Sequence, residues 1–183
     1  MPRASQPHSP ESDLAARRAY VAVESAPHVL APDLAEFCQS GISVIVGACV
    51  AGETPVAATG YACRLMPGNR FRLVLRKLGN EGLLEAVERG GAIAATFSQP
   101  TTHRSIQIKG SGAVVLPADE EDRREALRQT DGLRLELIYI GYPPAFAAAY
   151  RHVAEDDLVA VDLTPDAAFV QTPGPGAGAE LKP

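Results

Sequence analysis

The sequence predicts a mainly β domain of the α+β class, an antiparallel barrel, closed or partly closed, with helices inserted between its strands. Between residues 42 and 76, three extended segments follow one another through short turns. This spacing leaves no room for the crossover helices that a doubly wound parallel sheet needs. Further along, amphipathic helical patterns alternate with short β-branched runs. A chain of 183 residues is long enough for one such domain with a real core.

The first clear helical pattern covers Ala31–Gln39, where Leu34, Phe37 and Cys38 form one apolar stripe. A weaker helical pattern covers Ala15–Val23. The first helix with a strong signal therefore comes directly before the three strands.

The three strands that follow form an antiparallel meander. Ile42–Val50 is nearly all apolar, as expected for a strand that is buried on both faces. Pro55–Leu65 is a second extended run. Phe71–Arg76 alternates, so that Phe71, Leu73 and Leu75 share one face and Arg72, Val74 and Arg76 share the other.

Helices and strands then alternate to the end of the chain. Asn80 is a favourable N-cap for a helix that ends at Gly90-Gly91. The segment Leu133–Ile140 fits either a strand or a helix. The other predicted elements are strands at Ala92–Ser98 and Arg104–Leu116 (bent at Gly110 and Gly112), a helix from Asp119 to at least Gln129, a helix after Pro143-Pro144 to about His152, and two strands, Leu158–Leu163 and Ala167–Thr172, around a Thr-Pro-Asp turn.

Composition limits the classes of protein and the location. Residues 1–13 are predicted to be a disordered tail and residues 179–183 a C-terminal tail, which leaves one domain at 14–178. The net charge of −5 argues against nucleic acid as a partner. The apolar runs are too short to span a bilayer, and the first residues lack a signal-peptide core. We therefore expect a soluble cytoplasmic protein without a membrane partner.

No common catalytic or metal motif is present. Cys38, Cys49 and Cys63 lack metal-binding spacing and are expected to be buried, unreactive thiols. The sequence contains no Walker loop, no GxGxxG and no Gly-x-Ser-x-Gly element. Ordinary hydrolases, P-loop enzymes and Rossmann dehydrogenases are therefore disfavoured.

A basic pair precedes a predicted helix. Arg76 and Lys77 end a strand, and Asn80 starts a helix three residues later. A helix N-terminus with two nearby cations is suited to a phosphate group. The alternative is a solvated basic pair without a ligand.

Polar side chains alternate along the two strands that follow. Ser105, Gln107 and Lys109 share one strand face, and Thr96 and Ser98 share a face of the preceding strand. Arg104 opens the second strand next to the loop, with the opposite parity. Such donors suit the carbonyl and imide groups of a flat heteroaromatic cofactor such as a flavin. The alternative is the ordinary solvent face of a barrel.

Taken together, the chain resembles the pyridoxamine 5′-phosphate oxidase-like family of FMN-binding split barrels. The resemblance covers about 31–115 and extends more loosely to Gly178. It is carried by the following segments: Glu53-Thr54-Pro55, Lys77-Leu78-Gly79-Asn80, Ala92–Phe97, Ile106–Gly110 and Gln171–Gly176.

The resemblance implies an antiparallel split β-barrel that forms a homodimer, with FMN bound in clefts between the two subunits. Arg76 and Lys77 then correspond to the phosphate-binding pair, beside Asn80. The contacts to the phosphate, ribityl chain or ring are expected from Thr96, Ser98, Arg104 and Gln107, with Lys109 on the same strand. The C-terminal segment Gln171–Gly178 is expected to be ordered against the barrel.

The expected activity is that of an FMN-dependent oxidoreductase acting on a small-molecule redox substrate. The second strand reads Ala57–Tyr61 without the arginine of the vitamin B6 oxidases, so the resemblance does not specify pyridoxine 5′-phosphate as substrate. Two alternatives stay open. One is a flavin-binding module without turnover, and the other is a split barrel that holds deazaflavin or haem, for which His103 is the candidate axial ligand.

Overall fold

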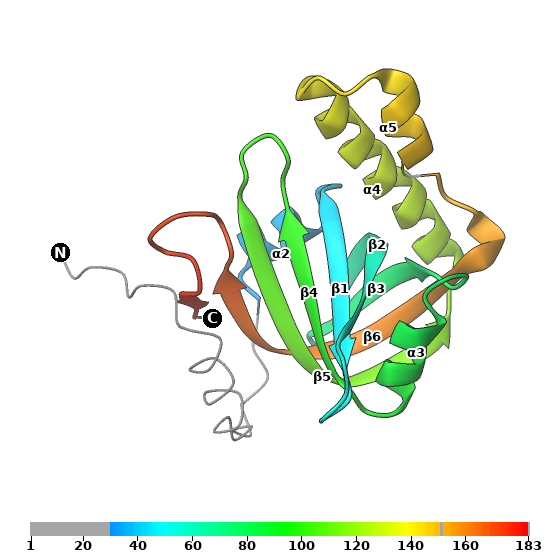
Figure 1. Ribbon diagram of the computed structural model, residues 1–183, viewed down its shortest axis with the longest axis vertical. Coiled ribbons are helices and arrows are strands. Elements are labelled where there is room, and N and C mark those ends of the chain that lie inside the picture. Colours follow the sequence, from blue (N-terminus) through cyan, green and yellow to red (C-terminus); the bar gives the residue numbers. More distant parts are fainter. Residues whose placement is uncertain (1–29, 151, 183) are drawn as a thin grey trace.

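The computed structural model describes residues 30–150 and 152–182 (Figure 1). The tail expected at 1–13 and the helix expected at Ala15–Val23 lie outside these residues. The described elements are α2 (Pro32–Cys38), β1 (Ser43–Cys49), β2 (Val56–Met66), β3 (Arg70–Arg76), α3 (Glu81–Glu88), β4 (Ala92–Ser98), β5 (Ser105–Pro117), α4 (Glu120–Tyr139), α5 (Pro144–Tyr150), the 3-10 helix η1 (Glu155–Asp157), β6 (Leu158–Val170) and β7 (Glu180–Leu181).

Six strands close into an antiparallel barrel. They are ordered β3-β2-β1-β4-β5-β6, and β6 pairs back onto β3 to complete the ring. The closing strand β6 is long enough to pair with β3 through its first half and with β5 along most of its length. The mainly β, antiparallel barrel with inserted helices is therefore confirmed.

The prediction of two strands around a Thr-Pro-Asp turn is wrong, because β6 runs without a break from Leu158 to Val170. Proline lacks the amide proton that a strand ladder uses, which is why its presence suggests a turn. Here Pro165 lies where the pairing of β6 with β5 shifts register, between Lys109 and Gly110. The irregular pairing accommodates the proline without interrupting the strand.

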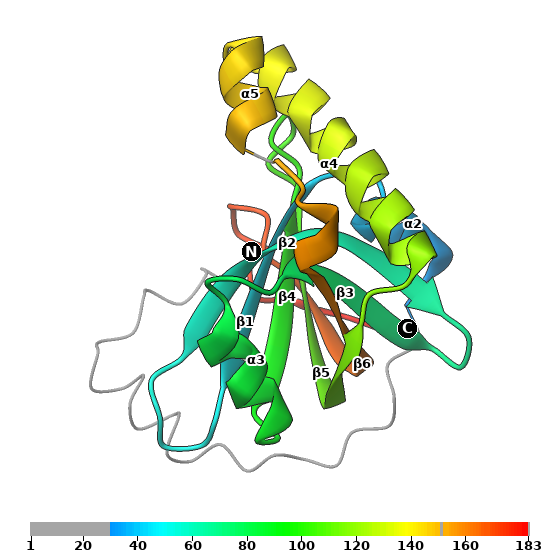
Figure 2. The same cartoon turned by 90° about the vertical axis from the view of Figure 1, so that its right-hand side faces the viewer.

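The barrel interior is one apolar core closed by a helix at each end. The rings of Phe71 and Phe97 meet edge to face, with 5.6 Å between their centroids. Leu83 and Val87 of α3 join this core where β1 ends, and Phe37 of α2 joins it where β1 begins. Figure 2 shows α2 and α3 on opposite sides of the barrel.

The ambiguous segment Leu133–Ile140 is helical up to Tyr139, as the last turns of the 20-residue helix α4. α4 packs outside the barrel, where Ala126 joins a small cluster with Ala62 of β2 and Val74 of β3. Together with α5 it extends beyond the barrel (Figure 1). The outer face of β2 and β3 is therefore covered by a helix.

A close backbone contact anchors α4 at the start of β1. Gly41 has a φ of +86°, and a Cβ atom on it would lie 2.9 Å from the Gln129 carbonyl oxygen and 3.0 Å from Gly132 Cα. Only glycine meets both requirements without strain.

The C-terminal segment folds back onto β6, as expected. The Gln171 N–H donates to the Ser105 carbonyl at 2.7 Å, and the Gly178 N–H donates to the Val170 carbonyl at 2.7 Å. Glu180–Leu181, which the sequence analysis assigns to a tail, instead form strand β7 against β6. Backbone hydrogen bonds thus order a segment whose composition alone favours disorder.

The outer face of β1, β4 and β5 is open in the described chain. Val44 and Val46 point into the core, whereas Ile45 between them is 44% exposed. The expectation that Ile42–Val50 is buried on both faces is therefore wrong for this single chain, since only its inner face is buried. Figure 1 shows these three strands side by side, with α4 away from them.

Candidate functional site

The turn between β3 and α3 brings Arg76, Lys77 and Asn80 together, as the sequence predicts. The side chains of Arg76 and Lys77 are exposed. Asn80 occupies the N-cap position of α3, but its side chain accepts no hydrogen bond from the helix. Its Nδ2 instead donates to the Arg76 carbonyl at 2.8 Å. Asn80 therefore braces the turn and does not cap the helix with its side chain.

A carboxylate from a distant part of the chain, that of Asp157, also binds this turn. Its Oδ2 accepts from Arg76 Nε at 2.9 Å, and its Oδ1 accepts from the Leu78 N–H at 3.1 Å. Its backbone carbonyl accepts from the Lys77 N–H at 2.8 Å. The bond to Asp157 raises the pKa of Arg76. Asp157 thus makes the contacts that an anionic ligand at this turn would make.

A second carboxylate reduces the positive character of the turn further. Glu81 accepts from the Gly79 N–H at 2.9 Å, and this bond lowers the pKa of Glu81. The amide groups of Leu78 and Gly79 are therefore already used by carboxylates of the protein. Within the described residues, the terminal Nη groups of Arg76 and the ammonium of Lys77 have no hydrogen-bond partner. These cationic groups are therefore available to an anionic ligand.

The predicted polar side chains of β4 and β5 face one another in pairs on the open face. Thr96 lies opposite Gln107, whose Nε2 donates to Thr96 Oγ1 at 3.2 Å. Ser98 lies opposite Ser105, and the Ser105 hydroxyl donates to Ser98 Oγ at 2.8 Å. The burial patterns confirm the alternation predicted for β4 and, on β5, for Gln107 and Lys109, whereas Ser105 is buried.

Two cations near these strands are each stacked on an aromatic ring. Lys109 lies on the open face, whereas Arg104 precedes β5 with the parity of the core-facing Ile106 and stacks towards α2. The Lys109 ammonium lies 4.7 Å from the centroid of the Phe169 ring on β6. The Arg104 guanidinium lies 4.2 Å from the centroid of the Phe37 ring on α2. Contacts of this kind hold long side chains in place while their hydrogen-bond donors stay available.

Strand pairing shows how far apart the two halves of the predicted site are. Thr59, Ile45, Thr96 and Gln107 form one row across β2, β1, β4 and β5. Arg76 adjoins this row from β3, since its neighbour Leu75 pairs with Gly60. Three strand spacings, roughly 14 Å, separate β3 from β4. A single ligand that touches both halves must therefore be elongated.

A pocket of about 300 Å³ opens next to the Ser98–Ser105 pair. It lies between the β4–β5 turn and the C-terminal segment, and it contains His103, the candidate axial ligand. Its lining residues are Ser43, Ser98, Gln99, Pro100, His103, Ser105, Gln171 and Pro173. Ser43 and Gln171 are distant in sequence from the β4–β5 turn, so sequence patterns did not connect them with it.

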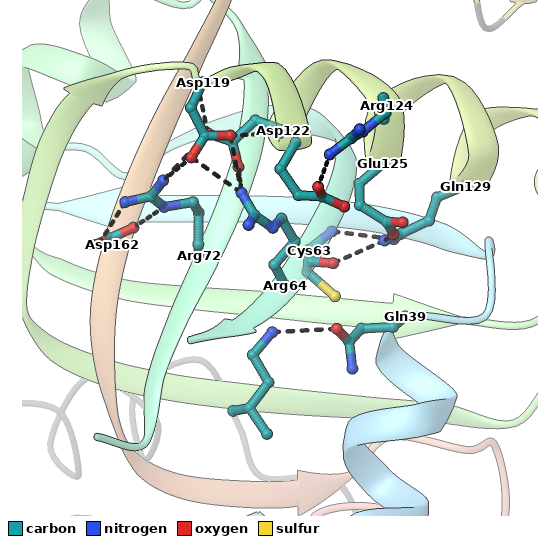
Figure 3. A network of polar contacts seen from close by, with 12 residues as sticks. Gln39, Cys63, Arg64, Arg72, Asp119, Asp122, Arg124, Glu125, Gln129 and Asp162 are labelled. Atoms are coloured by element: carbon teal, nitrogen blue, oxygen red, sulfur yellow. Dashed lines mark hydrogen bonds and ion pairs between the residues drawn. The ribbon is translucent and has the colours of Figure 1, made fainter. Parts of the chain in front are cut away.

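A charged network fixes α4 to the barrel (Figure 3). Arg64 Nη1 lies 2.5 Å from a carboxylate oxygen of the fully buried Asp122, and Arg72 Nε lies 2.6 Å from one of Asp162. Asp119 binds both arginines. The bond to Asp162 raises the pKa of Arg72. Because every carboxylate here has an arginine partner, the network is a structural anchor.

The larger cavity, of about 860 Å³, lies between α2, β2 and α4. Its lining includes Arg64 and the pair Arg128–Glu125, whose N–O distance is 2.7 Å. None of the predicted site residues lines this cavity. The structure therefore separates it from the open face of β4 and β5.

The three cysteines are free, and two of them are fully buried. Burial raises the pKa of Cys38 and Cys63, which confirms the expectation of unreactive thiols at these two positions. Cys49 is half-buried. Over the parts of the chain that the structure describes, no group of histidine, cysteine or acidic residues is arranged to hold a metal ion, and no helix is long and apolar enough to cross a membrane.

Comparison with solved structures identifies the fold. Campylobacter jejuni ChuZ matches with a TM-score of 0.50 at 14% identity, over 82% of this chain and 58% of ChuZ. HupZ of Group A Streptococcus matches with a TM-score of 0.49 at 12% identity, over 82% of this chain and 98% of HupZ. A Clostridium acetobutylicum protein related to general stress protein 26, of the pyridoxinephosphate oxidase family, matches with a TM-score of 0.46 at 14% identity. The match covers 82% of this chain and 92% of that protein.

No protein-family model matches the sequence, and no curated protein matches it. The similarity to solved structures therefore concerns the fold. At that level the six-stranded antiparallel barrel with inserted helices matches a split-barrel fold, as expected.

Proposed function

We propose that the protein is a homodimeric FMN-binding oxidoreductase that holds the flavin on the open outer face of β1, β4 and β5. The observation that carries the proposal is the Thr96–Gln107 pair on that face, with Arg76 and Lys77 on one side and Lys109 on the other. FMN, when bound, supplies the redox chemistry. No nucleophile from the protein is then required.

The phosphate end of the ligand is assigned to the β3–α3 turn. The Nη groups of Arg76 and the ammonium of Lys77 hold the phosphate by charge-assisted hydrogen bonds, and Asn80 keeps the turn in shape through its bond to the Arg76 carbonyl. Asp157 competes with the phosphate for Arg76, because it already accepts from that guanidinium. The phosphate therefore binds beside Asp157 or displaces it.

The polar face is assigned to the ring and the ribityl chain. The Gln107 amide and the Thr96 hydroxyl offer hydrogen bonds to ring carbonyl and imide groups. Lys109 adds positive charge on this face, and Arg104 adds positive charge at the end of the β4–β5 turn, next to α2. A positive environment stabilises a reduced, electron-rich ring.

The proposed partner is a second copy of the chain, packed on the same face. Ile45 is 44% exposed at the centre of that face, and Ala57, Ala92 and Ala94 of the neighbouring strands are small and apolar. An open sheet face without charged side chains from β1 and β4 is suited to packing against its own copy.

The proposed location is the cytoplasm. This proposal is supported by the three cysteines, none of which forms a disulfide bond, as is usual for proteins in a reducing compartment.

One spectrum separates the proposal from its alternatives. The protein as purified, or after mixing with FMN and removal of free FMN by gel filtration, is expected to show the two absorbance bands of a bound flavin and no intense haem band. A haem band that is lost in His103→Ala would instead support the haem alternative, which is favoured only by the position of His103 in the small pocket. Turnover of NADH or NADPH by the flavin-loaded protein separates an oxidoreductase from a flavin-binding module.

A further inference from the structure

The 300 Å³ pocket contains hydrogen-bonding groups that no protein group uses. Over residues 30–150 and 152–182, the Ser43 hydroxyl, the His103 ring and the Gln171 side-chain amide have no hydrogen-bond partner. Ser98 accepts from Ser105 and keeps its own proton for another acceptor. Four side chains from separate parts of the chain thus offer proton donors to the same small space.

The pocket is built on a turn held in one conformation. His103 has a φ of +60°, a left-handed conformation that is uncommon for residues other than glycine. Its N–H donates to the Gln99 carbonyl at 2.9 Å, and the Gln99 N–H donates to the Arg104 carbonyl at 2.9 Å. Glu136 of α4 accepts from Gln99 Nε2 at 2.9 Å. The turn thereby holds the imidazole at the pocket in spite of the backbone strain.

The C-terminal segment forms the opposite wall. The Ser105 N–H donates to Thr172 Oγ1 at 2.9 Å, and the Gln171 N–H donates to the Ser105 carbonyl at 2.7 Å. These bonds bring Gln171 and Pro173 to the pocket. The ordered C-terminal segment thus supplies one wall of the pocket.

The chemistry of the lining selects an anion over a cation. None of the lining residues is acidic or permanently charged, and Arg104 lies in the chain between His103 and Ser105. The nearby Glu136 carboxylate is already bonded to Gln99 and Thr101. Pro100 and Pro173 contribute apolar ring surfaces. Proton donors between flat apolar walls suit a planar carboxylate, and about 300 Å³ is at the small end of the usual range for ligand pockets.

We infer that this pocket binds a small planar carboxylate, as the site of the second reactant of the proposed flavin enzyme. The carboxylate accepts from Ser43, Ser98 and His103, and Gln171 closes over it. Ser98 is two residues from Thr96 on β4, roughly 7 Å along the strand. The bound carboxylate therefore lies next to the proposed ring donors. The reactant role rests on the proposed function, whereas the carboxylate site does not.

The test is a calorimetric titration of the flavin-free, full-length protein with benzoate and, as a neutral isostere, benzamide. Benzoate is expected to bind at least tenfold more tightly than benzamide. Ser43→Ala and His103→Asn each are expected to weaken benzoate about tenfold, as for one lost hydrogen bond to a charged group. Asparagine tolerates the left-handed backbone at position 103. Ser111→Ala, which changes an exposed serine of β5 outside the pocket, is expected to have no effect.

A parallel titration with FMN separates this inference from the proposed function. FMN binding without benzoate binding, or equal affinity for benzoate and benzamide, would overturn the carboxylate site and leave the flavin site standing. Benzoate binding without FMN binding would support the carboxylate site and overturn its role beside a flavin. Circular dichroism of both variants shows whether they fold. Unchanged benzoate affinity in folded Ser43→Ala and His103→Asn would also overturn the site.

Discussion

The Asp157 carboxylate lies 2.9 Å from Nε of Arg76, at the turn where the proposed function places a phosphate. It also accepts from the Leu78 N–H at 3.1 Å. An acidic side chain at this position balances the charge of the turn when no ligand is present. The same side chain opposes a bound phosphate by like-charge repulsion.

Removing the charge of Asp157 is expected to strengthen FMN binding. In Asp157→Asn the amide oxygen still accepts from the Leu78 N–H, but the repulsion of the phosphate is lost. At exposed sites such a repulsion is worth about 1 kcal/mol, which corresponds to about a fivefold lower Kd for FMN. Flavin-fluorescence titration measures the change.

The neighbouring residue provides the matched control for this experiment. Asp156→Asn removes the same charge from the same short helix, without a bond to the β3–α3 turn in the described structure. Its FMN affinity is expected to stay within twofold of the wild type. Equal or weaker FMN binding by Asp157→Asn would place the phosphate away from Arg76.

Gln107→Leu tests the ring end of the site. Gln107 donates to Thr96 on an open face, so its loss removes a donor for the ring without opening a hole in the core. We expect FMN and riboflavin to be weakened alike, about tenfold, because both carry the same ring. Titration of both flavins checks this. Loss of FMN affinity alone would assign Gln107 to the phosphate.

Ile45→Glu tests the proposed dimer. The wild type is expected to have twice the 19.3 kDa mass of one chain in light scattering at micromolar concentration. A buried, unpaired carboxylate at the interface would be costly, so the variant is expected to be monomeric. Leu127→Glu on α4 is the matched control, because the side chain of Leu127 is as exposed as that of Ile45 (45% and 44%) but lies outside the proposed interface. This variant is expected to stay dimeric. A wild-type monomer, or an unchanged dimer in Ile45→Glu, contradicts the proposed interface.

Asp119 is expected to stabilise the fold at neutral pH and not in acid. Partial burial opposes its ionisation, but bonds from the Asp122 N–H and from Arg64 lower the pKa of Asp119 below its usual 3.8. A lowered folded-state pKa gives stability that is complete above pH 3.8 and is lost as the pH falls below it. Asp119→Ala, which also loses the N-cap of α4, is expected to cost about 1–2 kcal/mol at pH 7.

Thermal unfolding at pH 7 and pH 3 measures this difference. For a domain of this size, each 1 kcal/mol lowers Tm by about 2–4 °C. The difference in Tm between the wild type and Asp119→Ala is expected to be smaller at pH 3 than at pH 7. Glu120→Ala, the adjacent exposed position, is expected to change Tm little at either pH. An equal difference in Tm at both pH values would mean that the charge of Asp119 does not stabilise the fold.

The strand faces could be predicted from sequence because alternation is a local property. The alternation of Phe71–Arg76 and the outward side chains of Gln107 and Lys109 follow from a period of two. Leu133–Ile140 was ambiguous, since a short apolar run fits either period. The segment is helical because it continues α4 without a break. The Asp119 and Asp122 side chains form a capping box at the start of that helix.

The features that sequence could not predict depend on contacts between distant segments. Asp157 binds Arg76 across 81 residues of chain, and no local pattern marks such a pair. The pocket likewise joins Ser43 to Gln171 through the order of strands in the barrel. The turn predicted at Pro165 is absent because the effect of this proline on β6 depends on its register with β5, which the sequence does not show.

The central claim, that Arg76 and Lys77 hold the phosphate of FMN, is tested most directly by comparing FMN with riboflavin. Each cation is expected to supply a charge-assisted hydrogen bond of about 1.5–3 kcal/mol. Arg76→Ala/Lys77→Ala is therefore expected to weaken FMN about a hundredfold or more and to leave riboflavin, which has no phosphate, nearly unchanged. Circular dichroism confirms that the variant is folded. Unchanged FMN affinity in a folded double variant would contradict the claim and move the phosphate towards Arg104 and Lys109.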